Sequence, residues 1–166
     1  MARVVIVGCG CRGIELAKLL QADGHAVRGT TRKQERVAEL EAAGIESWVG
    51  DPDKIATVHY SMENATILCW FLASAEGTPE SIDSLHGTRL EMMLERTIDS
   101  PVRGVLYEAT GSVDGEALCR GAGAVERLCD RNEIPWGLLK SDPSDHEAWA
   151  IAAKVAIDEL LSRDRG

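Results

Sequence analysis

The sequence predicts an α/β fold in which a parallel sheet of about six strands carries helices on both faces. Three observations lead to this prediction. Short apolar segments alternate along the chain with longer segments of helical periodicity. Residues 66–72 are apolar almost without interruption, which is typical of a strand buried on both faces. The first strand runs directly into a glycine loop, and a helix follows that loop at once.

Each predicted strand is short and is separated from the next by one helical segment. The predicted strands cover residues 4–7, 26–30, 46–49, 66–72, 104–108 and 136–140. The predicted helices cover residues 12–22, 34–43, 53–62, 88–98, 116–132 and 145–162. Gly24 and Gly44 follow the first two helices, where glycine commonly ends a helix in the left-handed conformation.

Two connections carry further signals. Residues 73–86 are rich in Ser, Gly, Glu and Pro and are expected to form a loop with one turn beginning at Thr78. Ser144, followed three residues later by Glu147, has the spacing of a capping box at the start of the last helix. Six strands connected in this way predict the order 3-2-1-4-5-6. The binding site is then expected at the switch point between strands one and four.

Length and charge limit the class of protein. A chain of 166 residues with 45% hydrophobic and 27% charged residues is expected to form one domain, 1–166. No apolar run reaches the ~18 residues of a membrane span. The first strand begins so close to Met1 that we expect no signal peptide and a cytoplasmic protein. A net charge of −9 disfavours a nucleic-acid partner.

The five cysteines are odd in number and scattered, which disfavours a disulfide framework and fits a reducing compartment. Cys9 and Cys11 are too close together and too isolated for a zinc site, so no metal site is expected. Both lie near a predicted helix N-terminus, where the pKa of a thiol can fall. They are therefore either small residues in a crowded loop or redox-sensing thiols.

The glycine loop has the spacing G-x-G-x-x-G and reads Gly8-Cys9-Gly10-Cys11-Arg12-Gly13. In a strand–loop–helix setting, Gly8 permits a tight turn, Gly10 lets the backbone approach a pyrophosphate, and Gly13 lets the helix pack closely. The helix N-terminus offers unpaired N–H groups to the phosphates. The pattern predicts a Rossmann-type dinucleotide-binding domain, and the alternative is a glycine turn that binds nothing.

The end of the second strand indicates which dinucleotide binds. NAD-binding domains carry an acid there, whereas this strand ends in Thr31-Arg32-Lys33. A guanidinium forms paired hydrogen bonds with phosphate oxygens, so Arg32 favours NADP over NAD. Thr31 can add a hydroxyl, and Arg12 is expected to reach the same ribose from the other side. The alternative is that Arg32 and Lys33 are solvated charges at the start of the next helix.

Several segments carry a family resemblance; they are residues 24–32, 40–44, 50–51, 105–112 and 134–140. They resemble the NmrA-like, atypical branch of the short-chain dehydrogenase/reductase superfamily. The resemblance implies that Arg12 and Arg32 hold the 2′-phosphate and that Asp51 contacts the adenine. It also implies that Leu72 and Ala73 line the inner ribose of the cofactor. The alternative for Asp51 is a helix cap before Pro52, and both roles can hold at once.

The chain departs from this superfamily in its catalytic residues. Reductases of the superfamily use a Tyr and a Lys four residues apart. Here Tyr60 is followed by Asn64 and Tyr107 by Gly111, so the dyad is absent. Tyr107 is expected to point into the packing of the sheet. Ser112 matches the position of the active-site Ser or Thr, but it lacks its partners.

Two classes of function follow. In the first, the protein is an NADP-dependent oxidoreductase that reduces a small carbonyl or enone substrate. In the second, it is a non-catalytic redox sensor or interaction module that binds NADP(H). Glu108, Lys140 and His146 are the remaining candidates for chemistry, and each also has an ordinary structural explanation. Leu90, Met92, Met93 and Leu94 make one helix apolar over more than one face, which indicates either a homodimer interface or deep packing.

Overall fold

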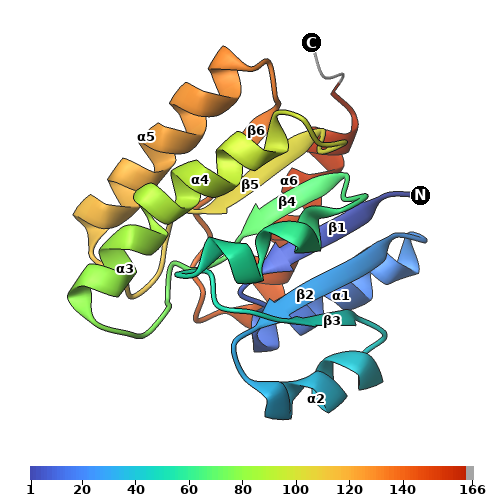
Figure 1. Cartoon of the computed structure of the whole chain (residues 1–166). Coiled ribbons are helices and arrows are strands. Elements are labelled where there is room, and N and C mark those ends of the chain that lie inside the picture. The colour runs from blue at the N-terminus through green and yellow to red at the C-terminus, as the bar shows by residue number, and fades with distance from the viewer. Residues whose placement is uncertain (164–166) are drawn as a thin grey trace.

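A six-stranded parallel sheet forms the centre of the molecule (Figure 1). The computed structural model describes residues 1–163. The strands are β1 (Arg3–Val7), β2 (Ala26–Thr31), β3 (Glu46–Val49), β4 (Ile67–Trp70), β5 (Gly104–Glu108) and β6 (Trp136–Leu139). Their order in the sheet is β3-β2-β1-β4-β5-β6, and every pairing is parallel. This confirms the doubly wound α/β fold and the strand order predicted from the sequence.

Helices cover both faces of the sheet. They are α1 (Cys11–Ala22), α2 (Val37–Ala42), α3 (Pro79–Leu85), α4 (Thr88–Thr97), α5 (Gly115–Arg131) and α6 (His146–Leu161). Helices α1 and α6 pack against each other on one face, and α4 packs against α5 on the other (Figure 1). Each face buries its own hydrophobic cluster, so the molecule has three layers.

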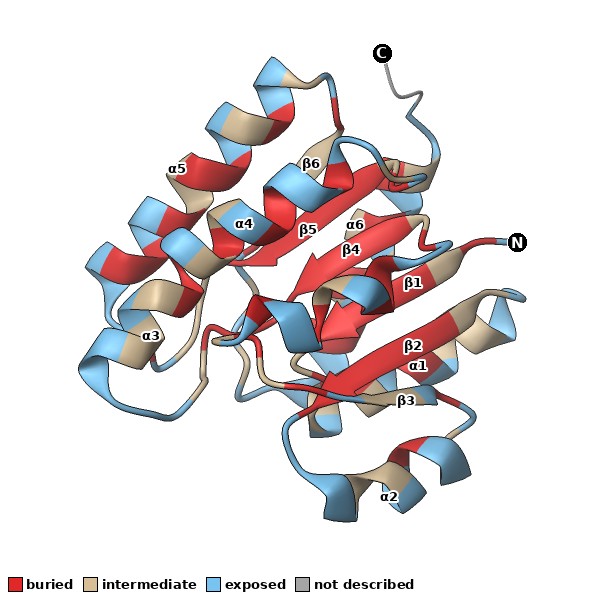
Figure 2. Cartoon of the chain, viewed as in Figure 1, coloured by how far each residue is buried: buried red, intermediate tan, exposed pale blue. Residues whose placement is uncertain are grey.

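The central strands are buried on both faces (Figure 2). All four residues of β4 are 0% exposed, as the continuous apolar run predicted. In the register of the sheet, Val7 lies beside Trp70, which in turn lies beside Tyr107. The carboxyl ends of β1, β4 and β5 therefore meet at one edge of the sheet, and the loops that follow these strands are brought together there.

The expectation that residues 73–86 form a loop was wrong in its second half, where α3 forms. The prediction that a turn begins at Thr78 was correct, because its side chain accepts a hydrogen bond of 3.2 Å from the backbone N–H of Ser81, and Pro79 occupies the first turn. Leu85 is buried and Ile82 packs against the core. Tertiary burial of these two side chains thus stabilises a helix that the polar composition did not predict.

The predicted capping box at α6 was also wrong. Asp145 is the N-cap, and its carboxylate accepts a hydrogen bond of 3.1 Å from the backbone N–H of Ala148. The hydroxyl of Ser144 instead donates to Asp142 at 2.8 Å. The cap is thus one residue later than predicted. Ser and Asp are both favoured N-cap residues, so the sequence did not distinguish Ser144 from Asp145.

Two predicted helices are partly or wholly of the 3₁₀ type. The segment predicted as residues 34–43 begins with a 3₁₀ turn, Gln34–Arg36, before α2. The segment predicted as residues 53–62 consists of two 3₁₀ turns, Ile55–Thr57 and His59–Met62. Hydrogen bonds to carbonyls three residues back close these short turns, which is the usual form of such connectors.

Helix α4 is mostly a core helix. Leu90, Met93 and Leu94 are buried, whereas Met92 is 39% exposed. Packing within the chain accounts for three of the four apolar residues, and the homodimer stays a prediction. Within residues 1–163, no helix combines the length and the hydropathy needed to cross a membrane.

Candidate functional site

A cavity of about 360 Å³ opens at the edge of the sheet where β1, β2 and β4 end. Its walls come from the glycine loop, the end of β2, the turn after β3, the segment after β4 and the start of α6. The lining residues include Gly8, Cys9, Gly10, Cys11, Arg12, Gly13, Thr31, Arg32, Lys33, Arg36, Asp51, Leu72, His146 and Trp149. The cavity lies at the switch point between β1 and β4, where ligands of such sheets bind.

The three glycines of the loop have three different environments. Gly8 has a φ of 88°, and a Cβ on it would lie 2.5 Å from the carbonyl oxygen of Phe71. A Cβ on Gly13 would lie 2.9 Å from the Sγ of Cys9, so this glycine permits the close contact between α1 and the sheet. A Cβ on Gly10 would meet nothing within 4 Å. Gly10 therefore leaves an open space above its backbone, as a bound pyrophosphate requires.

The first turn of α1 presents unpaired backbone donors to this space. Gly10 is the N-cap and has no side chain to satisfy the first amides. Within residues 1–163, the N–H groups of Cys11, Arg12 and Gly13 have no hydrogen-bond acceptor. N–H groups without acceptors at the positive end of a helix dipole are donors that an anion can accept from.

Thr30 at the end of β2 fixes the shape of the glycine loop. Its hydroxyl accepts a hydrogen bond of 3.0 Å from the N–H of Gly8, and its carbonyl accepts one of 3.0 Å from the N–H of Cys9. These bonds use the first two amides of the loop and leave those of the helix turn for a ligand. The loop is thus held in its geometry before any ligand binds.

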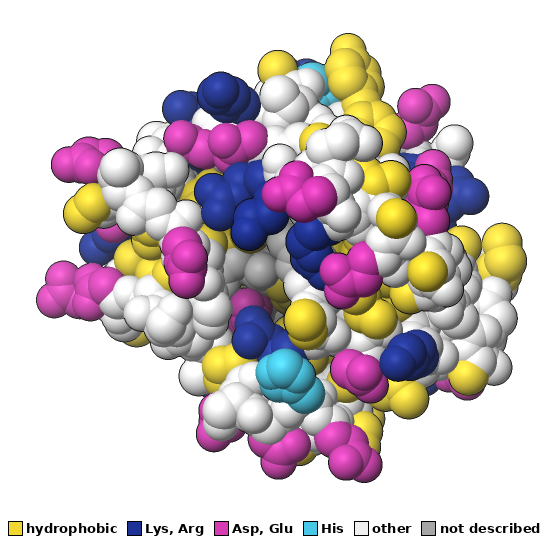
Figure 3. Space-filling view, turned by 90° about the horizontal axis from the view of Figure 1, so that it is seen from below, with side chains coloured by type: hydrophobic (Ala, Val, Ile, Leu, Met, Phe, Trp, Pro, Cys, Tyr) yellow, Lys and Arg dark blue, Asp and Glu magenta, His cyan; other side chains and the backbone are white. Residues whose placement is uncertain are grey.

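Three basic residues follow β2 at one end of the cavity. Arg32 and Lys33 are exposed, and Arg32 donates from Nη2 to the carbonyl oxygen of Glu76 at 3.3 Å. Arg36 donates from Nη1 to the carbonyl oxygen of Cys9 at 2.7 Å. Figure 3 looks at the molecule from below and shows Lys and Arg side chains gathered around a hollow near the middle of that face. In a chain of net charge −9, this is a local concentration of positive charge.

Arg36 is a site residue that the sequence reasoning missed. Its Nη2 is buried and lies 3.3 Å from Oε1 of Glu39, outside hydrogen-bond geometry, so this N–H has no hydrogen-bond partner among residues 1–163. A buried guanidinium N–H beside a cavity is a group that a bound anion can satisfy. Its only signal in the sequence was its closeness to Arg32 and Lys33, in the segment that follows the second strand.

The sequence led us to expect that Arg12 reaches the same ribose as Arg32 from the other side of the cavity, and the structure places its guanidinium against β5 and α6. Its Nη2 forms an ion pair of 3.2 Å with Oε2 of Glu108 on β5, and its guanidinium carbon lies 5.2 Å from the ring centre of Trp149 on α6. Its Nε is buried without a hydrogen-bond partner in the described part of the chain. The guanidinium groups of Arg12 and Arg32 thus contact different walls of the cavity, because a buried carboxylate attracts Arg12 toward β5.

Glu108 is 0% exposed and connects three walls of the site. Besides Arg12, it accepts hydrogen bonds of 3.1 Å from the N–H of Ala73 and 3.1 Å from Nε1 of Trp149. Burial raises the pKa of its carboxyl, and the charge of Arg12 opposes that rise. The three donors compensate a carboxylate in a place where an unpaired charge would be strongly destabilising.

Leu72 lines the cavity, whereas Ala73, which the resemblance placed beside the inner ribose, does not. Ala73 is 0% exposed and lies below the surface of the cavity. Its N–H is bound by Glu108, and its carbonyl accepts a hydrogen bond of 2.9 Å from the N–H of Val113. Both of its backbone groups are therefore used within the protein.

Thr31 and Asp51 line the cavity and also have structural roles. The hydroxyl of Thr31 accepts a hydrogen bond of 3.2 Å from the N–H of Lys33. The carboxylate of Asp51 accepts one of 2.9 Å from the N–H of Asp53 in a local turn. The helix cap expected before Pro52 does not form, because the next helical turn begins at Ile55 with Lys54 as its N-cap. The contact of Asp51 with adenine stays a prediction.

The two cysteines of the loop differ in environment. Cys9 is buried beneath α1, and burial raises the pKa of its thiol to about 12. A thiol in this state is not a reactive thiolate at neutral pH, so the structure disfavours the redox-sensing role for Cys9. Cys11 is exposed and lines the cavity. Both are free thiols.

Tyr107 is fully buried and is bound by His86. The Nε2 of His86 lies 3.0 Å from the carbonyl oxygen of Leu72, so this nitrogen carries the proton. Burial lowers the pKa of His86, and its neutral Nδ1 accepts a hydrogen bond of 2.7 Å from the hydroxyl of Tyr107. The tyrosine hydroxyl is used inside the core and is not available to a substrate.

The other candidates for chemistry lie in different places. His146 is exposed and lines the cavity from the first turn of α6. Lys140 and Ser112 are exposed and are not part of the lining. Tyr60 is 63% exposed and is likewise not part of the lining. The structure thus brings only His146, of these four, to the cavity.

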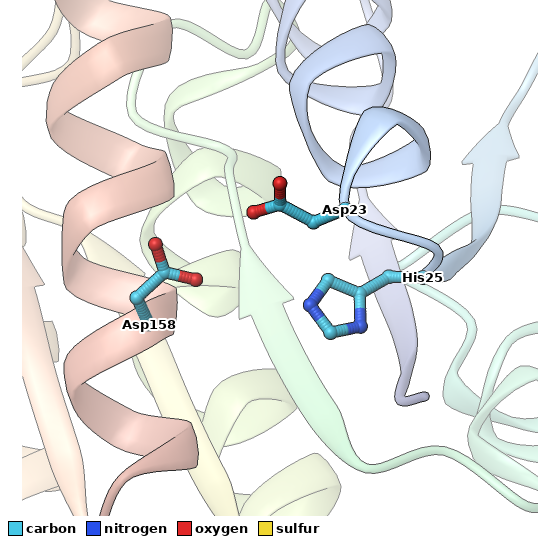
Figure 4. A group of neighbouring side chains, drawn as sticks. All are labelled: Asp23, His25 and Asp158. Carbon is cyan, nitrogen blue, oxygen red and sulfur yellow. The ribbon is translucent and has the colours of Figure 1, made fainter.

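A separate group of side chains has the spacing of metal ligands: Asp23, His25 and Asp158 point toward one another (Figure 4). The ammonium of Lys154 forms ion pairs with Asp23 and with Asp158, the latter at 2.5 Å. These contacts lower the pKa of Asp23. Nδ1 of His25 accepts a hydrogen bond of 3.1 Å from the N–H of Ala2. A positive charge from the protein already lies between the two carboxylates.

Comparison with known proteins agrees with this geometry. Residues 4–76 match the family model described as the TrkA-N domain. This segment contains the glycine loop, the end of β2 and the first residues after β4, which are the main walls of the cavity. The chain carries a Rossmann-type fold. A comparison with curated protein sequences found no significant match.

Solved structures share the fold at low sequence identity. Vestitone reductase from alfalfa (Medicago sativa L.) superposes with a TM-score of 0.63 and 15% identity, over 83% of this chain and 56% of that one. UDP-glucuronic acid 4-epimerase from Bacillus cereus in complex with NAD gives 0.68 and 14%, over 83% and 55%. Triphenylmethane reductase from Citrobacter sp. complexed with NADP(H) gives 0.62 and 18%, over 85% and 49%. This Rossmann-type chain spans about half the length of these proteins.

Proposed function

We propose that the chain binds NADP(H) in the cavity at the switch point. The pyrophosphate lies against the unpaired N–H groups of Cys11, Arg12 and Gly13, in the space that Gly10 leaves open. The 2′-phosphate lies among Arg32, Lys33 and Arg36. The observation that carries this proposal is the first turn of α1, whose donors lack acceptors and face a cavity bordered by basic side chains.

The preference for NADP over NAD rests on charge at the end of β2. The fold itself serves both cofactors, since one of the structural neighbours was solved with NAD and another with NADP(H). In this chain, no carboxylate follows β2 directly, and the unsatisfied Nη2 of Arg36 adds a donor beside the cavity. Two or three cations match a phosphate dianion far better than a neutral ribose hydroxyl.

Two roles for the bound cofactor remain distinct proposals. In the first, the chain is an oxidoreductase of the NmrA-like, atypical reductase type that acts on a small carbonyl or enone. Bound NADPH supplies the hydride, and the protein supplies binding and orientation. The backbone of α1 and the cations after β2 fix the cofactor, Leu72 and Trp149 limit access of water, and His146 is the titratable side chain available to hold or donate a proton.

The second role is a non-catalytic sensor of NADP(H) or an interaction module. The absence of the Tyr/Lys dyad favours it, and the hydroxyl of Tyr107 is bound to His86 in the core, so it does not replace the missing tyrosine. The position of Ser112 outside the cavity favours it as well. A screen of small aldehydes, ketones and enones with NADPH separates the roles: turnover abolished by His146→Ala supports the enzyme, and tight binding without turnover supports the sensor.

Thermal unfolding with NADP, NADPH, NAD, NADH and no ligand tests the binding proposal directly. A ligand at one hundred times its Kd adds about 2.7 kcal/mol of stability. For a chain of this size we expect Tm to rise by about 5–12 °C with NADP and NADPH and by less with NAD and NADH. Equal shifts for all four would contradict the NADP assignment, and no shift with any of them would contradict dinucleotide binding altogether.

A further inference from the structure

The two ends of the cavity differ in the charges they offer. The end near β2 has three cations, Arg32, Lys33 and Arg36. The other end, near β5 and α6, has Arg12, His146 and Trp149 in its lining, with the carboxylate of Glu108 directly behind Arg12. A dinucleotide whose 2′-phosphate occupies the first end and whose pyrophosphate crosses the start of α1 extends its nicotinamide toward the second end.

Arg12 and Glu108 form a compensated pair at that second end. The guanidinium is held by the 3.2 Å contact with the carboxylate and by the ring of Trp149. Trp149 and the N–H of Ala73 in turn hold the carboxylate. The pair is thus fixed in place, with a charge of each sign and no net charge.

The nicotinamide ring carries a positive charge when oxidised and none when reduced. A fixed charge beside it therefore acts on the oxidised form and leaves the reduced form largely unaffected. Arg12 alone would repel the oxidised ring, and Glu108 offsets that repulsion.

We propose that the Arg12–Glu108 ion pair determines the relative affinity of this site for NADP⁺ and NADPH. Because Glu108 compensates the positive charge of Arg12, NADP⁺ is not repelled and both redox forms bind. This inference rests on the proposed NADP(H) site and adds to it a role for a carboxylate that does not itself line the cavity. In a sensor, this relative affinity would set the NADP⁺/NADPH ratio to which the protein responds. In an enzyme, it would set how readily NADP⁺ dissociates after the reaction.

The test is the ratio of the Kd for NADP⁺ to the Kd for NADPH, measured by calorimetry. In Glu108→Gln, which keeps the size of the side chain and an acceptor for Trp149, Arg12 is left unbalanced. We expect the ratio to rise about threefold or more, the effect of one nearby unit charge. In the double variant Arg12→Gln/Glu108→Gln, neither charge remains, and the ratio returns toward that of the unmodified protein.

Two controls identify the cause of any change. Glu159→Gln makes the same charge change at an exposed position near the far end of α6, and the ratio is expected to stay the same. Adenosine 2′,5′-bisphosphate, which lacks the nicotinamide, is expected to bind every variant with the same Kd. Should Glu108→Gln fail to fold, Arg12→Gln replaces it, and the ratio is then expected to fall.

The outcomes distinguish a failure of this inference from a failure of the proposed NADP(H) binding on which it rests. An unchanged ratio in Glu108→Gln, with both cofactors still bound, overturns the inference and leaves the NADP(H) site intact. Failure of the unmodified protein to bind NADP⁺, NADPH or the bisphosphate overturns the proposed function, and the inference with it. A raised ratio that the double variant does not restore shows that Glu108 acts by another route and also overturns the inference.

Discussion

The guanidinium of Arg36 donates a hydrogen bond of 2.7 Å to the carbonyl oxygen of Cys9, and this bond joins the turn after β2 to the glycine loop after β1. The two residues are 27 positions apart in the sequence. One side chain thus supports the loop that faces the pyrophosphate and borders the end where the 2′-phosphate is proposed. Arg36 therefore supports the glycine loop and also borders the proposed phosphate site, so its replacement is expected to change both stability and cofactor affinity.

Arg36→Met is expected to lower the free energy of unfolding by about 1.5–3 kcal/mol, the contribution of a hydrogen bond from a charged group. It should weaken NADPH binding more than NADH binding, because only the former carries the 2′-phosphate. Urea unfolding and calorimetry measure the two effects. Lys33→Met, which removes an exposed cation nearby, serves as the control and is expected to leave stability unchanged.

Arg32→Ala is expected to weaken NADPH binding by about 1.5–3 kcal/mol and to affect NADH little. Arg32 is exposed and its bond to the carbonyl oxygen of Glu76 is long, so stability should be nearly unaffected. Titration of both cofactors by fluorescence measures the effect. Equal losses for NADPH and NADH would refute the assignment of Arg32 to the 2′-phosphate.

Gly10→Val is expected to fold normally and to lose dinucleotide binding. The φ of Gly10 is −96°, which other residues adopt, and a Cβ there meets nothing within 4 Å. The new side chain instead fills the space of the pyrophosphate. Gly13→Ala is the matched contrast: its Cβ would lie 2.9 Å from the Sγ of Cys9, so it should lower Tm. Unchanged NADPH affinity in Gly10→Val would contradict the role of the loop.

Gly121→Ala is expected to destabilise the chain by at least about 1–3 kcal/mol, the usual effect of overpacking. A Cβ at this position of α5 would lie 2.0 Å from the hydroxyl oxygen of Tyr107. Gly123→Ala, two residues later in α5, meets nothing within 4 Å and should stabilise the helix by about 0.5–1 kcal/mol. Chemical unfolding of the two variants is therefore expected to give changes of opposite sign.

Stability is expected to depend on pH through His86. Because burial lowers its pKa in the folded state, the unfolded chain binds the proton first as pH falls below the ordinary value of 6.5. The contribution of this residue is therefore fully present above about pH 6.5 and is lost as pH falls toward the folded pKa, by up to about 1.4 kcal/mol per pH unit.

Urea unfolding at pH 7.5, 6.5 and 5.5 measures the His86 effect. His86→Gln, whose amide can still donate to the carbonyl oxygen of Leu72, should show a flatter profile over this range. Glu108 has the opposite effect on the pH dependence of stability. Burial raises its pKa, so its contribution to the free energy of unfolding weakens as pH rises. The difference between the unmodified protein and His86→Gln isolates the histidine. Identical slopes would show that His86 does not titrate in this range.

Much of the fold was predictable because it depends on local patterns. The continuous apolar run at β4 and the boundaries of β3 and β5 were predicted from periodicity and turn residues. Helix α3 was missed because only two of its side chains reach the core and the rest are polar. In the sequence, such a pattern cannot be distinguished from that of a loop, because the contacts of Ile82 and Leu85 with the core exist only in the folded chain.

The candidate site was predictable in part for the same reason. The residues of the glycine loop and of the end of β2 are contiguous in the sequence, and the structure places them all on the cavity. Arg36 and Trp149 were missed as lining residues, since an arginine on a turn and a tryptophan on a helix have ordinary structural explanations. Arg12 was expected to reach the same ribose as Arg32, and its ion pair with the buried carboxylate of Glu108 was not predicted.

The sequence by itself predicted the alternation of strands and helices, the order of the strands, and a candidate site at the glycine loop. The alternation and the glycine spacing are local patterns, and the strand order follows from the rule for doubly wound sheets. Only the tertiary structure decided where the guanidinium of Arg12 lies, that the hydroxyl of Tyr107 is bound to His86, and that the thiol of Cys9 is buried. Each of these depends on burial and on a partner far away in the chain, because desolvation and pairing determine the energy of a polar group.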